Sequence, residues 1–154
     1  MTGARDLVAT LTRRGETVAV AESLTAGLVC ATLAEVPGAS AVLRGGLVVY
    51  ATDLKAVLAG VDERLLAEHG AVHPEVAAQL AAGARERCGA TWGLGLTGVA
   101  GPDPQDGIAP GTVHLGLSGP GTEVVRELAG EGDRAAIRVA AVRAAFALLG
   151  EHLH

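Results

Sequence analysis

Short apolar runs alternate with helix-like segments along most of this chain. Residues 17–21, 46–50 and 91–96 are rich in Val, Leu, Ala and Gly, which is typical of buried strands. Around these runs, hydrophobic residues recur at helical spacing, and the helix-like segments end at Gly or Pro. Because strands that alternate with helices form a sheet covered on both faces, we expect an α/β fold.

A predicted hairpin makes the sheet a mixed one. Residues 112–118 and 123–128 are two further predicted strands that flank Gly119-Pro120-Gly121, a typical hairpin turn. Helices are predicted over 3–14, from Ser23 or Thr25 to about Glu35, and over 53–59, 62–68, 74–88 and 133–149. The sequence therefore predicts one domain over residues 3–151, a three-layer α/β/α sandwich with a mixed, partly antiparallel sheet.

Charge and hydropathy exclude two classes of partner. The formal net charge is -5, and the basic residues are scattered, whereas a nucleic-acid-binding protein needs a basic stripe to displace counterions. No apolar run approaches the roughly 20 residues of a membrane span, and the N-terminus lacks the pattern of a secretory signal. We therefore expect a cytoplasmic protein that binds neither nucleic acid nor membrane.

Cysteine and histidine positions indicate neither a disulfide nor a metal site. Cys30 and Cys88 lie in apolar, helix-like surroundings without CxxC spacing, which is typical of buried thiols in a reducing compartment. His69 and His73 have the spacing of metal ligands on one helix, but the glycine and proline beside them break that helix. We therefore expect no metal.

Ser23 directly follows the first predicted strand and opens a predicted helix. Its hydroxyl would lie at the carboxyl end of the sheet, beside free helix N–H groups that favour an anion or a developing oxyanion. Ser23 is therefore a candidate nucleophile. The alternative is an ordinary N-cap, because Ser is among the preferred capping residues.

Lys55 is the only lysine in the chain, and the other basic residues are arginines. Unlike Arg, a desolvated Lys can lose its proton and accept one from a hydroxyl, so Lys55 is a candidate base. Tyr50, the only tyrosine, could orient such a pair, and Thr52 is a second candidate nucleophile that ranks below Ser23. The alternative is a solvated helical lysine beside a half-buried aromatic residue.

Residues 98–111 contain three prolines and no hydrophobic period, which predicts a long, ordered and functional loop. The G-x-G-x-x-G of residues 93–98 is not a dinucleotide-binding motif, because those prolines prevent a helix from following it. The glycines between 95 and 111 suit a backbone cradle for a phosphate or an amide, with Thr97 as a side-chain donor; a purely structural loop is the alternative. Arg134 and Arg138 share one face of the last predicted helix, where they would bind a phosphate or form surface ion pairs.

Five segments, taken together and in this order, resemble the C-terminal domain of the competence-damage-inducible, or CinA, family. They are E-S-x-T-x-G, Y-x-x-x-x-K, H-G-A-V, T-G-V-A-G-P-D and P-G-T-V-H, and the resemblance runs from about Arg5 to Leu149. It implies a nicotinamide-nucleotide amidase, which hydrolyses the carboxamide of nicotinamide mononucleotide to nicotinate mononucleotide and ammonia. Neither a metal nor a cofactor is implied.

The resemblance also implies roles for individual residues. Ser23 matches the nucleophile, Lys55 the base and Tyr50 an assisting residue, while N–H groups at a helix terminus would hold the oxyanion. The residues expected to bind substrate lie in the first motif, the glycine loop and the last helix: Thr25, Gly27, Thr97, Gly98, Gly101, Arg134 and Arg138.

Two positions depart from the usual family motif E-S-C-T-G-G. Leu24 replaces Cys, and Ala26 replaces the first Gly, where a methyl group restricts positive φ and narrows any backbone approach to substrate. A non-catalytic nucleotide-binding or regulatory domain is therefore the alternative function, and an interaction module without a ligand is a third. Ala- and Leu-rich helices also leave enough apolar surface for a homodimer.

Overall fold

The computed structural model describes residues 2–153, and its centre is a single five-stranded sheet. The strands lie in the order β2 (Leu43–Val48), β1 (Val18–Glu22), β3 (Trp92–Gly98), β4 (Thr112–Gly119) and β5 (Thr122–Ala129). β1 pairs in parallel with β2 and β3, whereas β4 is antiparallel to β3 and β5. The predicted mixed sheet and its hairpin are confirmed.

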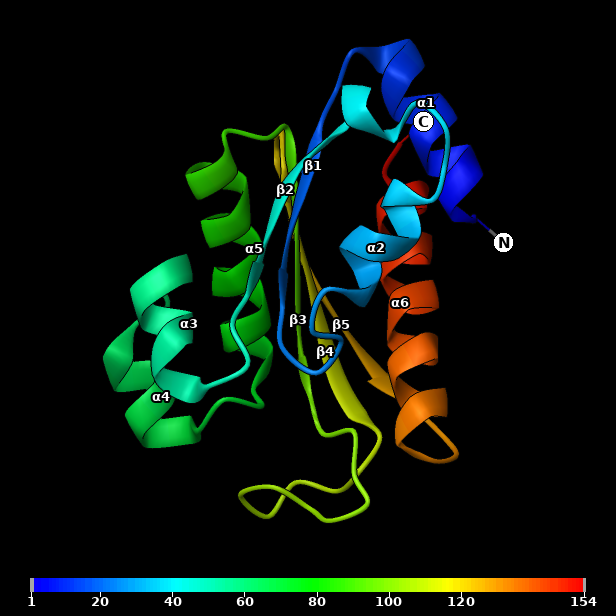
Figure 1. Ribbon diagram of the computed structural model, residues 1–154. Helices are drawn as coiled ribbons and strands as arrows, with labels where there is room; N and C mark the ends of the chain where they lie inside the picture. Colours follow the sequence, from blue (N-terminus) through cyan, green and yellow to red (C-terminus); the bar gives the residue numbers. More distant parts are fainter. Residues whose placement is uncertain (1, 154) are drawn as a thin grey trace.

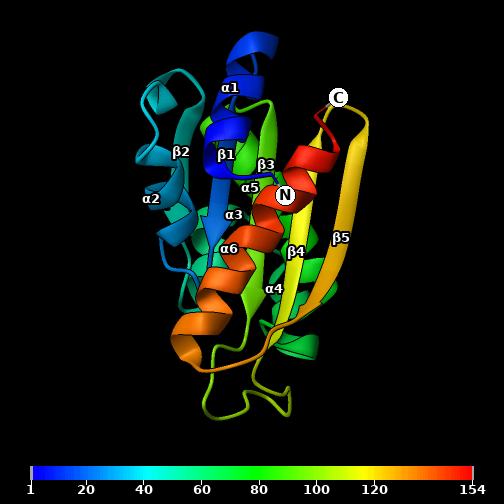
Figure 2. The same cartoon turned by 90° about the vertical axis from the view of Figure 1, so that its right-hand side faces the viewer.

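Helices cover both faces of the sheet (Figures 1 and 2). One face carries α3 (Thr52–Ala59), α4 (Glu63–His69) and α5 (Pro74–Cys88), and the other carries α1 (Ala4–Arg14), α2 (Leu28–Ala34) and α6 (Arg134–Glu151). A short 3-10 turn at Ala39–Ala41, which the sequence analysis did not predict, precedes β2. The predicted three-layer sandwich is confirmed. Within residues 2–153, each helix is too short or too polar to cross a lipid bilayer.

The two faces of the sheet carry side chains of different size. On β1, Val18 and Val20 belong to the large cluster under α1, α2 and α6, whereas Ala19 and Ala21 belong to the smaller cluster under α5. The α5 side of β3 and β4 also carries glycines, and a Cβ at Gly116 would overlap the carbonyl oxygen of Ala77 in α5. The missing side chains therefore let the backbone of α5 lie directly on the sheet.

Two predicted elements have different bounds. The strand predicted over 46–50 runs from Leu43 to Val48, because its pairing with β1 sets its length, and Tyr50 lies beyond it. The helix predicted from Ser23 or Thr25 begins only at Leu28, with Gly27 as its N-cap. Ala26 and Gly27 have φ values of +47° and +98°, so residues 23–27 form a turn that is incompatible with a continuous helix.

Candidate active site

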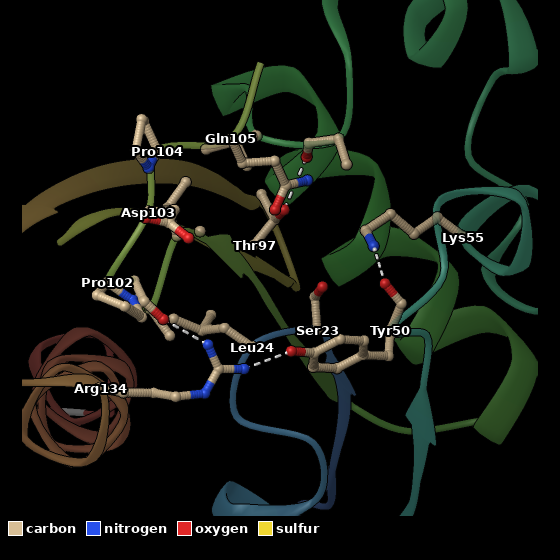
Figure 3. Close-up of a pocket in the computed structure, with 16 residues that line it drawn as sticks. Ser23, Leu24, Tyr50, Lys55, Thr97, Pro102, Asp103, Pro104, Gln105 and Arg134 are labelled. Atoms are coloured by element: carbon tan, nitrogen blue, oxygen red, sulfur yellow. Dashed lines mark hydrogen bonds between the residues drawn. The ribbon is translucent and has the colours of Figure 1, made fainter. Parts of the chain in front are cut away.

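A cavity of about 420 Å³ lies at the carboxyl ends of β1 and β3 (Figure 3). The turn after β1, the segment between β2 and α3, the loop after β3 and the start of α6 all contribute to its wall. Of the sequence-predicted site residues, it is lined by Ser23, Tyr50, Lys55, Thr97, Gly98, Gly101 and Arg134. The fold thus brings together residues from four separate stretches of the chain.

Lys55 is buried at the wall of this cavity, with only 1% of its surface exposed. Its Nζ donates to the backbone oxygens of Val49, at 2.8 Å, and Tyr50, at 3.2 Å. Burial lowers the pKa of Lys55 to about 8, and no carboxylate of the described chain pairs with the amine to offset this effect. The alternative of a solvated helical lysine is therefore wrong.

The two hydrogen bonds of Lys55 also match the neutral form of its amine. A neutral amine has two hydrogens and one lone pair, and the two carbonyls accept both hydrogens. The lone pair is then left to accept a proton from a group in the cavity. The site is thus chemically suited to a lysine base.

Ser23 lies in the same cavity, and its side chain and that of Lys55 both point into it (Figure 3). The Ser23 N–H donates to the oxygen of Leu96 at 3.1 Å, which continues the pairing of β1 with β3 beyond the end of β1. The Ser23 hydroxyl makes no hydrogen bond with any residue between 2 and 153, so it is available to a ligand. Ser23 is not the helix cap that the alternative interpretation required.

Glu22 takes the place at the start of α2 that the sequence analysis gave to Ser23. Its carboxylate is buried and accepts from the N–H groups of Val29, at 2.8 Å, and Cys30, at 3.1 Å. These helix-terminal donors are therefore not available to an oxyanion, and the expectation that they would hold one is wrong. An acidic residue at the end of a buried strand was the signal that the sequence offered for this role.

Glu22 also affects the thiol of Cys30. Burial, followed by the negative charge of Glu22, raises the pKa of Cys30 to about 12. The thiol therefore stays protonated near neutral pH and is a poor nucleophile. Cys30 and Cys88 are both free, and both are partly rather than fully buried.

Arg134 connects two segments at the rim of the cavity. One guanidinium nitrogen donates to the Tyr50 hydroxyl and another to the oxygen of Gly101, both at 2.6 Å (Figure 3). Both acceptors are neutral, and no carboxylate among residues 2–153 pairs with Arg134. An uncompensated positive charge therefore lies beside the cavity. Tyr50 meets Lys55 through its backbone oxygen, whereas its hydroxyl contacts Arg134.

Thr97 is held by the protein itself. Its hydroxyl donates to the oxygen of Ala71 at 2.7 Å, so its proton is not free for a ligand. The predicted donor role is therefore wrong, although Thr97 does line the cavity. The glycine-rich end of β3 is also partly structural, because a Cβ at Gly95 would overlap the backbone of α5.

Four other candidates do not line the cavity. Thr25 is fully buried with an unpartnered hydroxyl, Gly27 is the N-cap of α2, and Arg138 donates to the carbonyls of Leu24 and Thr25. Thr52, the second candidate nucleophile, lies in a separate groove between α3 and α4. The structure therefore does not bring these side chains to positions where they contact a ligand in this cavity.

The sequence analysis missed part of the cavity wall. The additional lining residues come mostly from the H-G-A-V motif and the loop after β3: Leu24, Ala71, Val72, Val99, Ala100, Pro102, Asp103, Pro104 and Gln105. The loop as a whole was predicted to be functional, but the polarity of Asp103 and Gln105 did not show that these two residues, rather than other polar residues of the loop, line the cavity. In the described part of the chain, no group of three or more His, Cys, Asp or Glu side chains is arranged to hold a metal.

The departure from the family motif at Ala26 lies outside the cavity wall. Ala26 adopts the positive φ that a glycine would favour, and this costs about 1 kcal/mol of backbone strain. Its side chain is exposed and is not part of the cavity wall. The expectation that its methyl group narrows the approach to substrate is therefore wrong.

Comparison with known proteins shows the CinA family over residues 2–153. The model of the CinA C-terminal domain matches residues 2–153. A CinA-like protein from Frankia casuarinae is 54% identical over 139 residues, which are 90% of this chain and 32% of that protein. A CinA-like protein from Anaeromyxobacter sp. (strain Fw109-5) is 50% identical over 144 residues, which are 93% of this chain and 35% of that protein. The chain thus spans about a third of the length of these curated relatives.

Crystal structures of related proteins have the same fold. The competence/damage inducible protein CihA from Agrobacterium tumefaciens is 36% identical, with a TM-score of 0.92 over 96% of this chain and 92% of that chain. A CinA superfamily protein from Klebsiella pneumoniae is 30% identical, with a TM-score of 0.94 over 97% of this chain and 94% of that chain. The family model, the sequence relatives and the related structures all indicate the family that the motifs around the cavity resemble. The chain belongs to the CinA family, and it matches that family's C-terminal domain.

Proposed function

We propose that this domain is an amidohydrolase that converts nicotinamide mononucleotide to nicotinate mononucleotide and ammonia. The substrate comes from the family resemblance, and the chemistry is supported by one observation above all. A buried lysine with a pKa of about 8 and no acidic partner shares a cavity with an unbonded serine hydroxyl. At pH 8 about half of such lysines are neutral, against well under 1% for a lysine with an ordinary pKa.

Ser23 and Lys55 share the acylation step. The Ser23 oxygen bonds to the carboxamide carbon as its proton passes to the neutral amine of Lys55, and the carbonyl oxygen becomes an oxyanion. The bond between carbon and nitrogen then breaks, and Lys55 returns the proton to the leaving nitrogen, which departs as ammonia. The product of this step is an ester of Ser23.

Water completes the reaction at the same two residues. Lys55, neutral again, accepts a proton from the water molecule that attacks the ester carbon. The bond between that carbon and the Ser23 oxygen breaks, and Ser23 recovers its proton from Lys55. The net reaction consumes one water molecule and leaves both side chains as they began.

Arg134 gives the cavity its preference for an anionic substrate. The guanidinium is held at the rim by two neutral acceptors, the Tyr50 hydroxyl and the Gly101 carbonyl. A phosphate group would accept charge-assisted hydrogen bonds from the same guanidinium, and such bonds are about twice as strong as neutral ones. Gly98 and Gly101 line the same cavity as this arginine and Ser23.

The proposal is tested by measuring ammonia release from nicotinamide mononucleotide. Wild type should release ammonia. Ser23→Ala and Lys55→Met should each lose at least a thousandfold in kcat, because one lacks the nucleophile and the other lacks the base that activates it. Thr52→Ala is the matched control, since Thr52 lies outside the cavity and should keep full activity. In wild type, kcat/KM should rise with pH and level off above about pH 8.

The same experiment distinguishes the amidase from the alternative, a non-catalytic nucleotide-binding domain. Turnover that survives both substitutions would exclude Ser23 and Lys55 as the reacting pair. Tight binding of the nucleotide by wild type without ammonia release would instead support a non-catalytic nucleotide-binding domain. Such binding is detected as a rise in thermal stability with ligand concentration, because a ligand that binds only the folded state stabilises it.

A further inference from the structure

Arg138 in α6 holds the turn that carries Ser23. Its Nε donates to the oxygen of Leu24 at 2.9 Å, and its Nη2 donates to the oxygen of Thr25 at 3.0 Å. These are the two carbonyls that directly follow the proposed nucleophile. One planar guanidinium therefore binds two successive peptide groups through two of its nitrogens, in a fixed geometry that a lysine does not reproduce.

Two N–H groups of this turn donate within the protein. Ser23 donates to Leu96, and Ala26 donates back to Ser23 at 3.0 Å. Beyond the turn, Leu28 donates to Thr25, and the next two N–H groups donate to Glu22. The turn is thus fixed from the strand side, from α2 and from α6.

Among the described residues, three N–H groups of residues 23–27 have no acceptor: those of Leu24, Thr25 and Gly27. Of these three residues only Leu24 lines the cavity, and it directly follows Ser23. Buried backbone N–H groups are rarely left without a partner unless a ligand or water supplies one. An N–H next to the nucleophile is also where acyl-transfer enzymes often place an oxyanion donor.

We propose that the backbone N–H of Leu24 donates to the oxyanion and that Arg138 is the positioning residue that keeps this N–H in place. The proposal rests on the amidohydrolase function proposed above. The peptide planes on both sides of Leu24 are fixed, one by the bond from Ala26 to the Ser23 oxygen and the other by the bond from Arg138 to the Leu24 oxygen. Because a peptide group is planar, the first bond fixes the direction of the Leu24 N–H, which shares its plane with the Ser23 carbonyl. Arg138 holds the adjoining peptide planes and so the turn in which this N–H lies.

Substitution of Arg138 tests the positioning role. Arg138→Met should lower kcat at least tenfold, with KM and the affinity for nicotinate mononucleotide within twofold of wild type. The reason is that the displaced N–H would weaken its bond to the oxyanion, which forms only during the reaction, and not the binding of substrate or product. Arg138→Lys should be intermediate. Arg143→Met is the matched control, because Arg143 is an exposed arginine of the same helix and should leave kcat unchanged. A loss of product affinity with unchanged kcat would show that Arg138 binds substrate and would overturn the proposal.

A second variant tests the N–H directly. Replacing the amide between Ser23 and Leu24 with an ester removes this hydrogen and keeps Arg138, so it decides the question even if Arg138→Met fails to fold. We expect the ester variant to lose roughly 100-fold to 1000-fold in kcat, as is usual for one oxyanion donor. An ester variant with wild-type kcat would overturn the proposal.

A labelling experiment separates this proposal from the amidase proposal. The serine oxygen displaces fluoride from a fluorophosphonate, and during this attack negative charge builds on the phosphoryl oxygen where the oxyanion would lie. The labelling rate therefore reports on the same donor without the nucleotide. Ser23 labelling, followed by mass spectrometry, should be at least tenfold slower in Arg138→Met and in the ester variant than in wild type and Arg143→Met. If the four proteins show these labelling rates but wild type releases no ammonia, the amidase proposal fails and the role of Arg138 and Leu24 stands. Equal labelling rates in all four proteins, or no labelling of wild type, would overturn the role of Arg138 and Leu24.

Discussion

Lys55 links the free energy of unfolding to pH, because its charged form is disfavoured in the folded protein. The folded state loses the Lys55 proton near pH 8, whereas the unfolded chain keeps it up to about pH 10.5. Between these values the unfolded state binds more protons, so the free energy of unfolding rises with pH. Below pH 8 both states are protonated, and the full cost of burying the charge is present.

Denaturation by urea should reveal this linkage. The free energy of unfolding of wild type, relative to that of Lys55→Met, should increase by about 2 kcal/mol between pH 7 and pH 10. The comparison with the variant is needed because Cys30, whose folded pKa is raised, lowers stability above about pH 9 in both proteins. If the difference in the free energy of unfolding between wild type and Lys55→Met does not change with pH, Lys55 titrates as an ordinary lysine.

Glu22 is expected to stabilise the turn behind Ser23 through its two backbone hydrogen bonds. Glu22→Gln leaves one good acceptor and turns an amide NH2 towards the other N–H, so we expect a loss of about 2 kcal/mol in the free energy of unfolding. Removing the charge should also lower the pKa of Cys30, so a thiol reagent should modify Cys30 faster. Glu35→Gln, at the exposed other end of α2, is the control and should change neither quantity.

At the scale of helices and strands, local signals predicted the ends of some elements well. α5 begins at Pro74 and ends before Gly89, and α6 begins after Asp133, whose side chain accepts from the Ala136 N–H. These boundaries depend on residues within one turn of the helix, so the sequence contains the necessary information.

Other parts of the structure depend on contacts between distant residues. The start of α2 is set by the Glu22 carboxylate and by the positive φ of Ala26, which resemble no standard start signal. The sequence pattern identified Ser23, Lys55 and Arg134 correctly as neighbours of one cavity. It did not predict that Arg138 would bind the carbonyls of Leu24 and Thr25, because residue types alone do not show which backbone oxygens lie within reach.

The contact between α5 and the sheet predicts a sensitive glycine. In Gly116→Ala the new methyl group would overlap the Ala77 backbone, and neither the strand nor the helix has a flexible side chain there to move aside. We expect a loss of about 3 kcal/mol in the free energy of unfolding, at the upper end of overpacking effects. Gly45→Ala on β2 is the matched control, because its methyl group would meet only Cys88 Sγ at 3.7 Å. Equal urea midpoints for the two variants would contradict this account.

At the scale of the whole molecule, strand order explains where the cavity lies. β1 has β2 on one side and β3 on the other, and the chain leaves β1 through α2 on one face but reaches β3 through α3, α4 and α5 on the other (Figure 1). Connections that diverge in this way leave a crevice at the carboxyl ends of the two strands, which is where α/β proteins generally bind ligands. Ser23 follows β1, and Thr97 and Gly98 end β3, so the topology itself places them in this crevice.

The same strand order leaves β2 as an edge strand, and our expectation of a homodimer rests on this edge and on exposed apolar side chains near it. Four of the six exposed large hydrophobic side chains of the described chain lie between residues 48 and 58: Val48, Tyr50, Val57 and Leu58. Edge strands with exposed apolar neighbours tend to pair with another chain, so we expect two copies to associate through β2 and α3. Val57→Glu should therefore shift sedimentation velocity from a dimer to a monomer, because a charge in the contact is costly to desolvate. Val139→Glu on α6, exposed to 43%, should stay dimeric, and a monomeric wild type at micromolar concentration would contradict the expectation.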